Sequence, residues 1–340
     1  MLRNNRIIIV LLFLIVSLPF VTYAGTKEEN FKKRVLAIPA KNFESYTFSP
    51  KTPLISRIES APSFVLAYLR NMDNRPDYLS YTPSEEERSL IQEYILKLPP
   101  VHKNVLKKRL IAIYFVNGFL GSGMADYVIS KNSDIYTILV FNPLLLSTKI
   151  SKWFTYRENT CFISSSSEYK IQIDCGKEFT GLMYGLLHET SHILDYILQY
   201  TPYTEPELTK INGFKVKASA FVQGIWDGYR KPSKKYAFTN RENVTFYGLG
   251  GGPKINVTDA VMLYKQLAKT PFVSLYGSLS WAEDFAELIT FYHLTEKLHQ
   301  PYEIKCYEKG KLVYSYSPMN SLKVQQRLHT IKNIYREKKY

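Results

Sequence analysis

The chain has 340 residues and a formal net charge of +14, and 45% of its residues are apolar. It holds no internal repeat and no long low-complexity tract, which excludes repeat arrays and favours one large domain, or a catalytic domain with a helical lobe packed on it. The basic surface is expected to attract anionic partners, although a merely solvated basic face explains the same charge.

The first 24 residues have the pattern of a signal peptide. Arg3 and Arg6 precede an apolar run over residues 7–20, and Thr22 and Ala24 are the small residues that a signal peptidase requires. The run is short for a transmembrane helix, although an uncleaved anchor stays open as an alternative. The sequence therefore predicts an exported protein, periplasmic or secreted, that begins at Gly25. Its anionic neighbours in the cell envelope would be membrane headgroups or cell-wall polymers, not nucleic acid.

Residues 25–60 mix Lys, Pro and Ser around scattered aromatic residues and predict an irregular lead-in. A domain is expected over residues 61–300, and its first part, about 61–130, is expected to be a helical N-terminal lobe. Helices are predicted at 63–72, 84–97 and 101–109, and strands at 110–116 and 135–142. These elements, with those that follow, predict an α+β fold that is mainly helical.

Three cysteines are candidates for disulfide bonding in an oxidising compartment. Cys161 and Cys175 flank a Ser-rich turn between two β-branched or aromatic runs, which predicts a hairpin closed by their disulfide. Such a bond would stabilise the fold by about 3 kcal/mol through the unfolded state. Cys306 would then be unpaired, and the other pairings stay open.

The segment 178–199 carries the most informative motif of the chain, His188-Glu189-Thr190-Ser191-His192. It contains no Pro and has a broad apolar flank, which predicts a buried helix. Two His at i and i+4 project from one helical face and can share a metal ion, whereas Glu189, about 100° round the axis, reaches a water instead. Asp195 is a candidate for holding the far nitrogen of a ligand imidazole.

The segment 201–255 is rich in Pro and Gly and predicts a long connection, either a lid over the site or a plain surface loop. A helix is predicted at 259–268. Residues 301–340 are expected to form a C-terminal unit packed on the domain, with a hairpin of strands 302–307 and 311–316 and a last helix at 321–336.

Residues 281–293 predict an amphipathic helix that completes the metal site. Glu283 and Glu287 lie at i and i+4 on one of its faces. A hydrolytic zinc site takes three protein ligands and a water, so a third ligand beside the two His is required for one Zn²⁺ per chain. Glu283 is a candidate for this ligand, with Asp284 and Glu287 as rivals. The remaining Glu of the pair would support a ligand His.

The two motifs, HETSH and the downstream EDFAE, resemble those of the gluzincin metallopeptidases, and among these most of all the lethal-factor-type zinc endopeptidases. The resemblance covers about 110 residues, and the rest of the chain matches no family known to us by eye. It implies that Glu283 is the third zinc ligand and that Glu287 braces His188. It also implies that Tyr276, seven residues before Glu283, stabilises the oxyanion of the reaction.

The same resemblance implies a zincin-like metallopeptidase domain, with a small antiparallel sheet and an active-site helix that carries the HExxH motif. In such folds an edge strand before this helix pairs with extended substrate, a role implied here for the strand at 135–142. The residues after His192 lack the Gly and the third His of the metzincins, which argues against that branch.

The sequence therefore predicts an exported zinc metallopeptidase that cleaves protein or peptide substrates, with Glu189 as general base. A rival interpretation is a non-catalytic envelope protein that binds anionic polymers and whose metal is structural or absent. Structural zinc sites are mostly closed by four ligands rich in Cys, whereas the cysteines here lie away from the motif. This difference favours the enzyme.

Overall fold

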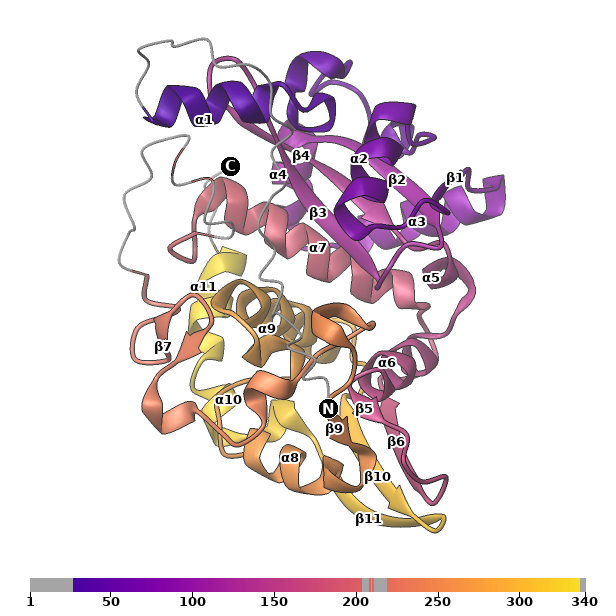
Figure 1. The fold of residues 1–340 in the computed structure, drawn as a ribbon, viewed down its shortest axis with the longest axis vertical. Helices are drawn as coiled ribbons and strands as arrows, with labels where there is room; N and C mark the ends of the chain where they lie inside the picture. The colour runs from indigo at the N-terminus through magenta and orange to yellow at the C-terminus, as the bar shows by residue number, and fades with distance from the viewer. Residues whose placement is uncertain (1–26, 204–207, 209, 211–218, 337–340) are drawn as a thin grey trace, which may run out of the picture.

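The computed structural model describes residues 27–203, 208, 210 and 219–336. A four-stranded sheet forms one layer, and two buried helices, α7 (Gly181–Leu198) and α9 (Trp281–Glu296), lie side by side beneath it (Figure 1). Helices account for 48% of the described residues and strands for 19%, which is compatible with the predicted α+β class. Within the described residues, no helix is long and apolar enough to cross a membrane.

The four-stranded sheet has the order β1-β2-β4-β3. Its strands are β1 (Leu79–Tyr81), β2 (Leu110–Asn117), β3 (Gly123–Ile129) and β4 (Ile135–Phe141). β2 and β4 run parallel, whereas the other two pairs are antiparallel. The sheet is therefore mixed, and the expectation of an antiparallel sheet is wrong for this layer. The strand expected at the edge, β4, is internal, and β3 is the edge strand nearest to α7.

The two faces of the sheet carry separate cores because side chains alternate along each strand. One face, which includes Tyr114, Val116 and Ile138, packs against α2 (Ser63–Asp73). The opposite face, which includes Phe115 and Phe141, joins the main core of the molecule. That core is shared with α7, α3 (Glu85–Lys97) and α4 (Pro100–Arg109).

Helix α3 begins where the sequence predicts, because Ser84 and Glu87 form a reciprocal capping box. The prediction that residues 25–60 form an irregular lead-in is wrong in part. It contains α1 (Lys27–Leu36) and three short 3₁₀ turns, and it is tied to the sheet by bridges from Asn42 to Ile129 and from Ile58 to Ile113. The predicted signal peptide lies outside the described residues.

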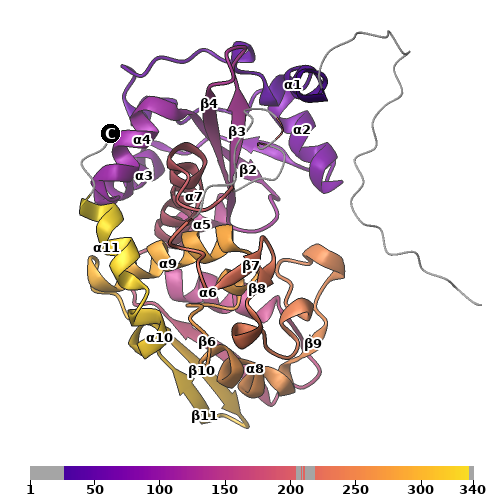
Figure 2. The ribbon, with the colours of Figure 1, turned by 90° about the vertical axis from the view of Figure 1, so that its left-hand side faces the viewer.

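Short elements build the rest of the molecule, most of them on the side of α9 away from the four-stranded sheet, whereas α5 packs against α7 (Figure 2). They are α5 (Leu144–Ser147), α6 (Ile150–Asn159), β5 (Phe162–Ile163), β6 (Tyr169–Asp174), β7 (Trp226–Gly228), β8 (Lys231–Pro232), β9 (Ile255–Asn256), α8 (Ala260–Leu267), β10 (Glu303–Glu308), β11 (Lys311–Tyr316), α10 (Leu322–Gln325) and α11 (Leu328–Arg336). The predicted C-terminal hairpin is confirmed as β10 and β11. The prediction of a single helix at 321–336 is wrong, because this segment forms two helices, α10 and α11.

The predicted hairpin between Cys161 and Cys175 is also wrong. β5 pairs with β9, and β6 pairs with β10, so the two strands belong to different sheets. Cys161, Cys175 and Cys306 are all free and buried, and the proposed disulfide is not formed. Burial raises the pKa of the Cys161 thiol to about 12.

Candidate metal centre

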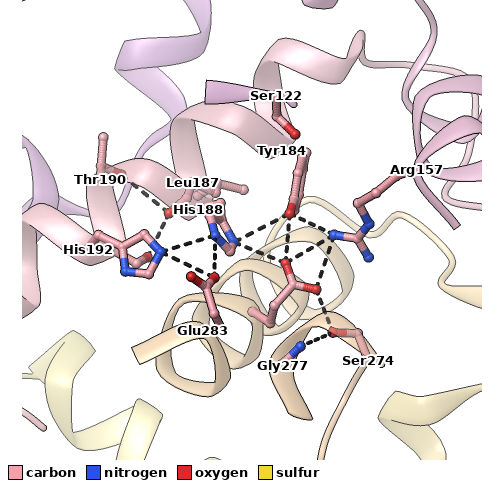
Figure 3. A network of polar contacts seen from close by, with 12 residues as sticks. Ser122, Arg157, Tyr184, Leu187, His188, Thr190, His192, Ser274, Gly277 and Glu283 are labelled. Atoms are coloured by element: carbon pink, nitrogen blue, oxygen red, sulfur yellow. Dashed lines mark hydrogen bonds and ion pairs between the residues drawn. The ribbon is translucent and has the colours of Figure 1, made fainter. Parts of the chain in front are cut away.

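His188 and His192 of α7 meet Glu283 of α9 at one point between the two helices (Figure 3). Nε2 of His188 lies 3.2 Å from Nε2 of His192 and 3.1 Å from Oε2 of Glu283. His192 Nε2 lies 3.4 Å from the same carboxylate oxygen. Both imidazoles are buried, whereas the Glu283 side chain is 24% exposed, so the cluster borders on solvent through the carboxylate. These three residues can hold a metal ion.

The start of α9 determines which acidic residue reaches this point. Ser280 is its N-cap, and the Ser280 hydroxyl accepts a hydrogen bond from the backbone N–H of Glu283. The next residue, Asp284, points about 100° further round the helix. Its carboxylate accepts two hydrogen bonds from Arg327, at 2.8 and 2.7 Å, and one from Trp226 Nε1 at 2.8 Å. Asp284 is therefore not available as a ligand.

Glu287 lies behind His188, one turn further along α9. Its Oε1 is 3.0 Å from His188 Nδ1, the ring nitrogen that faces away from the cluster. Tyr184 donates a hydrogen bond to the same oxygen at 2.9 Å, and Ser274 donates to Oε2 at 2.6 Å. Such a carboxylate fixes the tautomer and the orientation of a ligand His, as the sequence predicted for this residue.

Arg157 of α6 completes this buried network, and no pattern in the sequence predicted it. Its guanidinium donates to Tyr184 Oη at 2.6 Å and to Glu287 Oε2 at 3.2 Å. The other side of the guanidinium donates to Glu158 at 3.0 Å, and Glu158 also accepts a hydrogen bond from Tyr264. Arg157 is fully buried, so its two carboxylate partners are what offset the loss of hydration. Its role could have been predicted only from a contact between α6 and α7, which the sequence pattern does not indicate.

The carboxylates and imidazoles shift one another's pKa in this metal-free arrangement. Burial alone lowers the pKa of His188, but hydrogen bonds to Glu283 and Glu287 outweigh it and raise this pKa to about 10. Burial raises the pKa of Glu287, but Arg157 and His188 outweigh it and hold the value at about 2. His192 and His188 likewise hold the pKa of Glu283 well below its usual range. The centre therefore favours two ionised carboxylates, which suits a bound cation.

Glu189 takes a different direction from the two His of its motif. Its Oε2 accepts a hydrogen bond at 2.8 Å from the backbone N–H of Ala125, on the edge strand β3. Burial raises the pKa of the Glu189 carboxyl above its usual value, although His188 and His192 oppose this shift. A carboxylate with a raised pKa, held next to a metal centre, is suited to accept and release a proton.

Tyr276 lies beside the cluster, in a short 3₁₀ turn that precedes α9. Its ring centroid is 5.6 Å from that of His188 and 5.1 Å from that of Phe246. Among the described residues, its hydroxyl has no hydrogen-bond partner. Burial raises the pKa of this phenol well above its usual value, so the hydroxyl keeps its proton and remains a donor.

Asp195 does not hold a ligand His, contrary to the prediction. Its carboxylate accepts hydrogen bonds from the backbone N–H and the hydroxyl of Thr201, just beyond the C-terminal end of α7. Nδ1 of His192 is buried without a hydrogen-bond partner in the described part of the chain. The offset of three residues places Asp195 on the same side of the helix as His192, but its carboxylate turns towards the helix end instead.

Two other histidines are buried away from the centre. His102 Nε2 lies 3.1 Å from the Ser191 hydroxyl, and Ser191 donates to Leu187 O, so His102 Nε2 is the donor. His293 contacts the Tyr335 hydroxyl and the Lys97 carbonyl oxygen. Neither residue reaches the metal centre.

The fold and the site thus define a mixed α and β chain with a three-residue candidate metal centre. Comparison with protein-family models, with curated protein sequences and with solved structures gave no match.

Proposed function

We propose that this chain is an exported zinc metallopeptidase. The observation that carries the proposal is that His188, His192 and Glu283 converge on one point while Glu189, the acid of the same motif, is held at the edge of a sheet. This division separates three metal ligands from one base, as hydrolytic chemistry requires.

The distances among the ligand atoms suit zinc. A tetrahedral ion with ligands at about 2.0–2.1 Å holds neighbouring ligand atoms about 3.3 Å apart. The three ligand atoms here lie 3.1, 3.2 and 3.4 Å from one another. The donor set of two imidazoles and one carboxylate is also one that zinc takes in catalytic sites. No Cys belongs to the group, which disfavours a closed structural site.

A bound zinc ion would polarise the scissile carbonyl and lower the pKa of a water towards about 7. Glu189 accepts the proton of the attacking water and delivers it to the leaving amine. Glu287 keeps the proton of His188 on Nδ1, so that Nε2 stays a lone-pair donor. Tyr276, which keeps its own proton, donates a hydrogen bond to the oxygen that becomes negative in the transition state.

Export is part of the proposal because of the pattern over residues 1–24. It is tested by Edman sequencing of the protein recovered from the envelope or the medium, which we expect to begin at Gly25. A chain that keeps Met1 and stays with the membrane would favour the anchored alternative. In either location the basic charge would draw the enzyme to anionic membrane or cell-wall surfaces.

The central experiment compares metal content and peptide cleavage in wild type, Glu283→Ala and Glu189→Gln. We expect about one zinc per wild-type chain by plasma mass spectrometry, and much less in Glu283→Ala. Glu189→Gln should keep its zinc and lose turnover by roughly 10²–10⁴-fold. Glu296→Gln, an exposed position on α9, is the matched control and should behave as wild type.

Two outcomes would contradict the proposal in different ways. Full activity in Glu189→Gln would remove this residue as the base. A folded wild type that holds no zinc and refuses added zinc would favour the envelope protein that binds anionic polymers. That alternative predicts binding to cell-wall material that is unchanged by a chelator.

A further inference from the structure

A cavity of about 380 Å³ opens at the end of the four-stranded sheet, lined by the chain at residues 117–121 and 142–144. The turn between β2 and β3, residues 117–121, forms one wall. Leu144, Trp153, Tyr156 and Tyr247 form the others. Its volume lies in the range of about 300–1,000 Å³ that is usual for ligand pockets.

The cavity continues the accessible part of the edge strand β3. Gly123 and Met124 are partly exposed, whereas the strand from Ala125 to Ile129 is buried. The buried half is covered by the lead-in, because Lys41 forms an ion pair with Asp126, and Asn42 forms a bridge with Ile129. A peptide that lies along this edge next to Glu189 therefore extends towards residue 121 and the cavity, not in the opposite direction.

Two paths give the distance from the centre to the cavity. Gly121 precedes Ala125 by four residues, the last of them in β3, which is at most about 13 Å at 3.3 Å per residue. Along α7, Gly181 packs against Trp153 of the cavity wall and precedes His188 by seven residues, which is about 10 Å. Both paths correspond to three to four residues of an extended peptide.

The lining of the cavity combines four aromatic residues with aliphatic ones, two asparagines and one cation, Arg75. Arg75 donates to both carboxylate oxygens of Asp77, at 2.8 and 2.6 Å, so its charge is neutralised at the rim. Trp153 Nε1 donates to Ser122. The exposed lining residues include Tyr156, 54% exposed, and Leu144, 60% exposed, together with Asn117 and Gly118.

We propose that this cavity binds an aromatic or long aliphatic side chain of the peptide substrate, three to four residues from the cleaved bond on one side only. This subsite rests on the proposed peptidase function. The apolar part of the wall, which includes Phe119, Leu144 and Trp153, favours such a side chain through apolar contact and ring packing. Recognition at this distance would make cleavage depend on a stretch of sequence, not on one residue.

The test is digestion of a mixed peptide library by the zinc-loaded protein, with mass-spectrometric mapping of the residues around each cut. We expect aromatic and long aliphatic residues to be enriched at the third or fourth position on one side. Two peptides that differ only in having Phe or Ala at this position form a matched pair. The ratio of their kcat/KM values, Phe over Ala, should be at least tenfold lower in Leu144→Glu than in wild type. Tyr156→Ala should lower it in the same direction. Leu322→Glu changes another largely exposed leucine, which does not line the cavity, and should leave the ratio unchanged.

A second readout needs no turnover. Fluorescence anisotropy of the labelled Phe and Ala peptides with Glu189→Gln protein measures binding directly, and Leu144→Glu in that background should remove the preference for Phe. Cleavage without enrichment at this position, or enrichment that survives both cavity variants, would overturn the subsite and leave the peptidase standing. Absence of any cleavage would overturn the proposed function, and equal binding of both peptides would then overturn the subsite as well.

Discussion

Glu287 lies 3.0 Å from Nδ1 of His188, while Glu283 lies 3.1 Å from Nε2 of the same ring. One imidazole of α7 is thus held between two carboxylates from successive turns of α9. When Nδ1–H donates to Glu287, the lone pair of Nε2 faces Glu283 and His192. Under the proposed function, the spacing of four residues in α9 would give one carboxylate to the metal and the other to the imidazole that binds it.

Replacing Glu287 by Gln should weaken zinc binding without removing it. The amide keeps the shape and can still accept from Nδ1–H, but the loss of the negative charge makes His188 a poorer ligand. A loss of roughly 10–100-fold in affinity is typical for such a change. Competition with a chromophoric chelator measures it, and Glu296→Gln is the control. An unchanged affinity would mean that Glu287 only supports the fold.

Glu283 and Asp284 are neighbours in sequence, yet their variants should fail in opposite ways. Glu283→Ala should leave a folded protein with little zinc. Asp284→Ala should keep one zinc per folded chain but lose about 3–5 kcal/mol of stability, because it leaves Arg327 buried without its carboxylate partner. Urea unfolding combined with metal analysis separates the two effects. If Asp284→Ala loses its zinc while Glu283→Ala keeps it, Asp284 and not Glu283 is the third ligand.

Arg157→Met should be among the most destabilising single changes in the chain. It leaves Glu158 and Glu287 buried without their guanidinium, which costs about 3–5 kcal/mol. Arg157→Lys, which keeps one charge but not the fork of donors, should recover part of this loss. Denaturant midpoints of the three proteins test the order. If Arg157→Met is as stable as wild type, the buried ion pairs make no net contribution to the free energy of unfolding.

The candidate ligands were predictable because helical periodicity alone fixes their faces. His188 and His192 had to project together, and so did Glu283 and Glu287, whatever the rest of the chain does. Arg157, Tyr184 and the Ala125 N–H were not predictable in this way. Each acts through a contact between elements that are far apart in sequence, and a lone Arg in α6 resembles any surface Arg until its burial is known.

The strand predicted at 135–142 is present as β4, but its expected place at the edge of the sheet is wrong for a related reason. The apolar run of β4 marks a strand buried on both faces, but it does not say which strands lie beside it. Here β2 and β3 flank it, which moves the edge to β3. β6 finds its partner in β10, about 130 residues away, and so the two runs around the Ser-rich turn do not meet as a hairpin.

The free cysteines give a direct check of that correction. We expect the intact mass of the mature protein to be the same with and without reductant, and all three thiols to react with a thiol reagent only after unfolding. Burial of Cys161, Cys175 and Cys306, with a raised pKa for each, keeps the reactive thiolate scarce in the folded state. A mass increase of two protons on reduction would restore the predicted disulfide.

The two buried histidines outside the centre should make the metal-free protein sensitive to mild acid. Burial lowers the pKa of His102 from 6.5 to about 3 and that of His293 to about 4. Below pH 6.5 the unfolded chain therefore binds protons that the folded chain does not. The stability that these two neutral groups contribute is fully present above pH 6.5 and is lost as the pH drops towards 3. At pH 5 one such group costs roughly 2 kcal/mol.

His102→Leu should remove its share of this acid sensitivity. The leucine fills a similar volume, and Ser191 keeps its hydrogen bond to Leu187 O, so the variant should remain folded at pH 7.5. Urea unfolding at pH 7.5 and pH 5, on chelator-treated protein, should show a difference between the two pH values that is smaller than in wild type by roughly 2 kcal/mol. The exposed His329→Leu is the control. If His102→Leu and wild type lose the same stability between these pH values, His102 is not the group that titrates on unfolding.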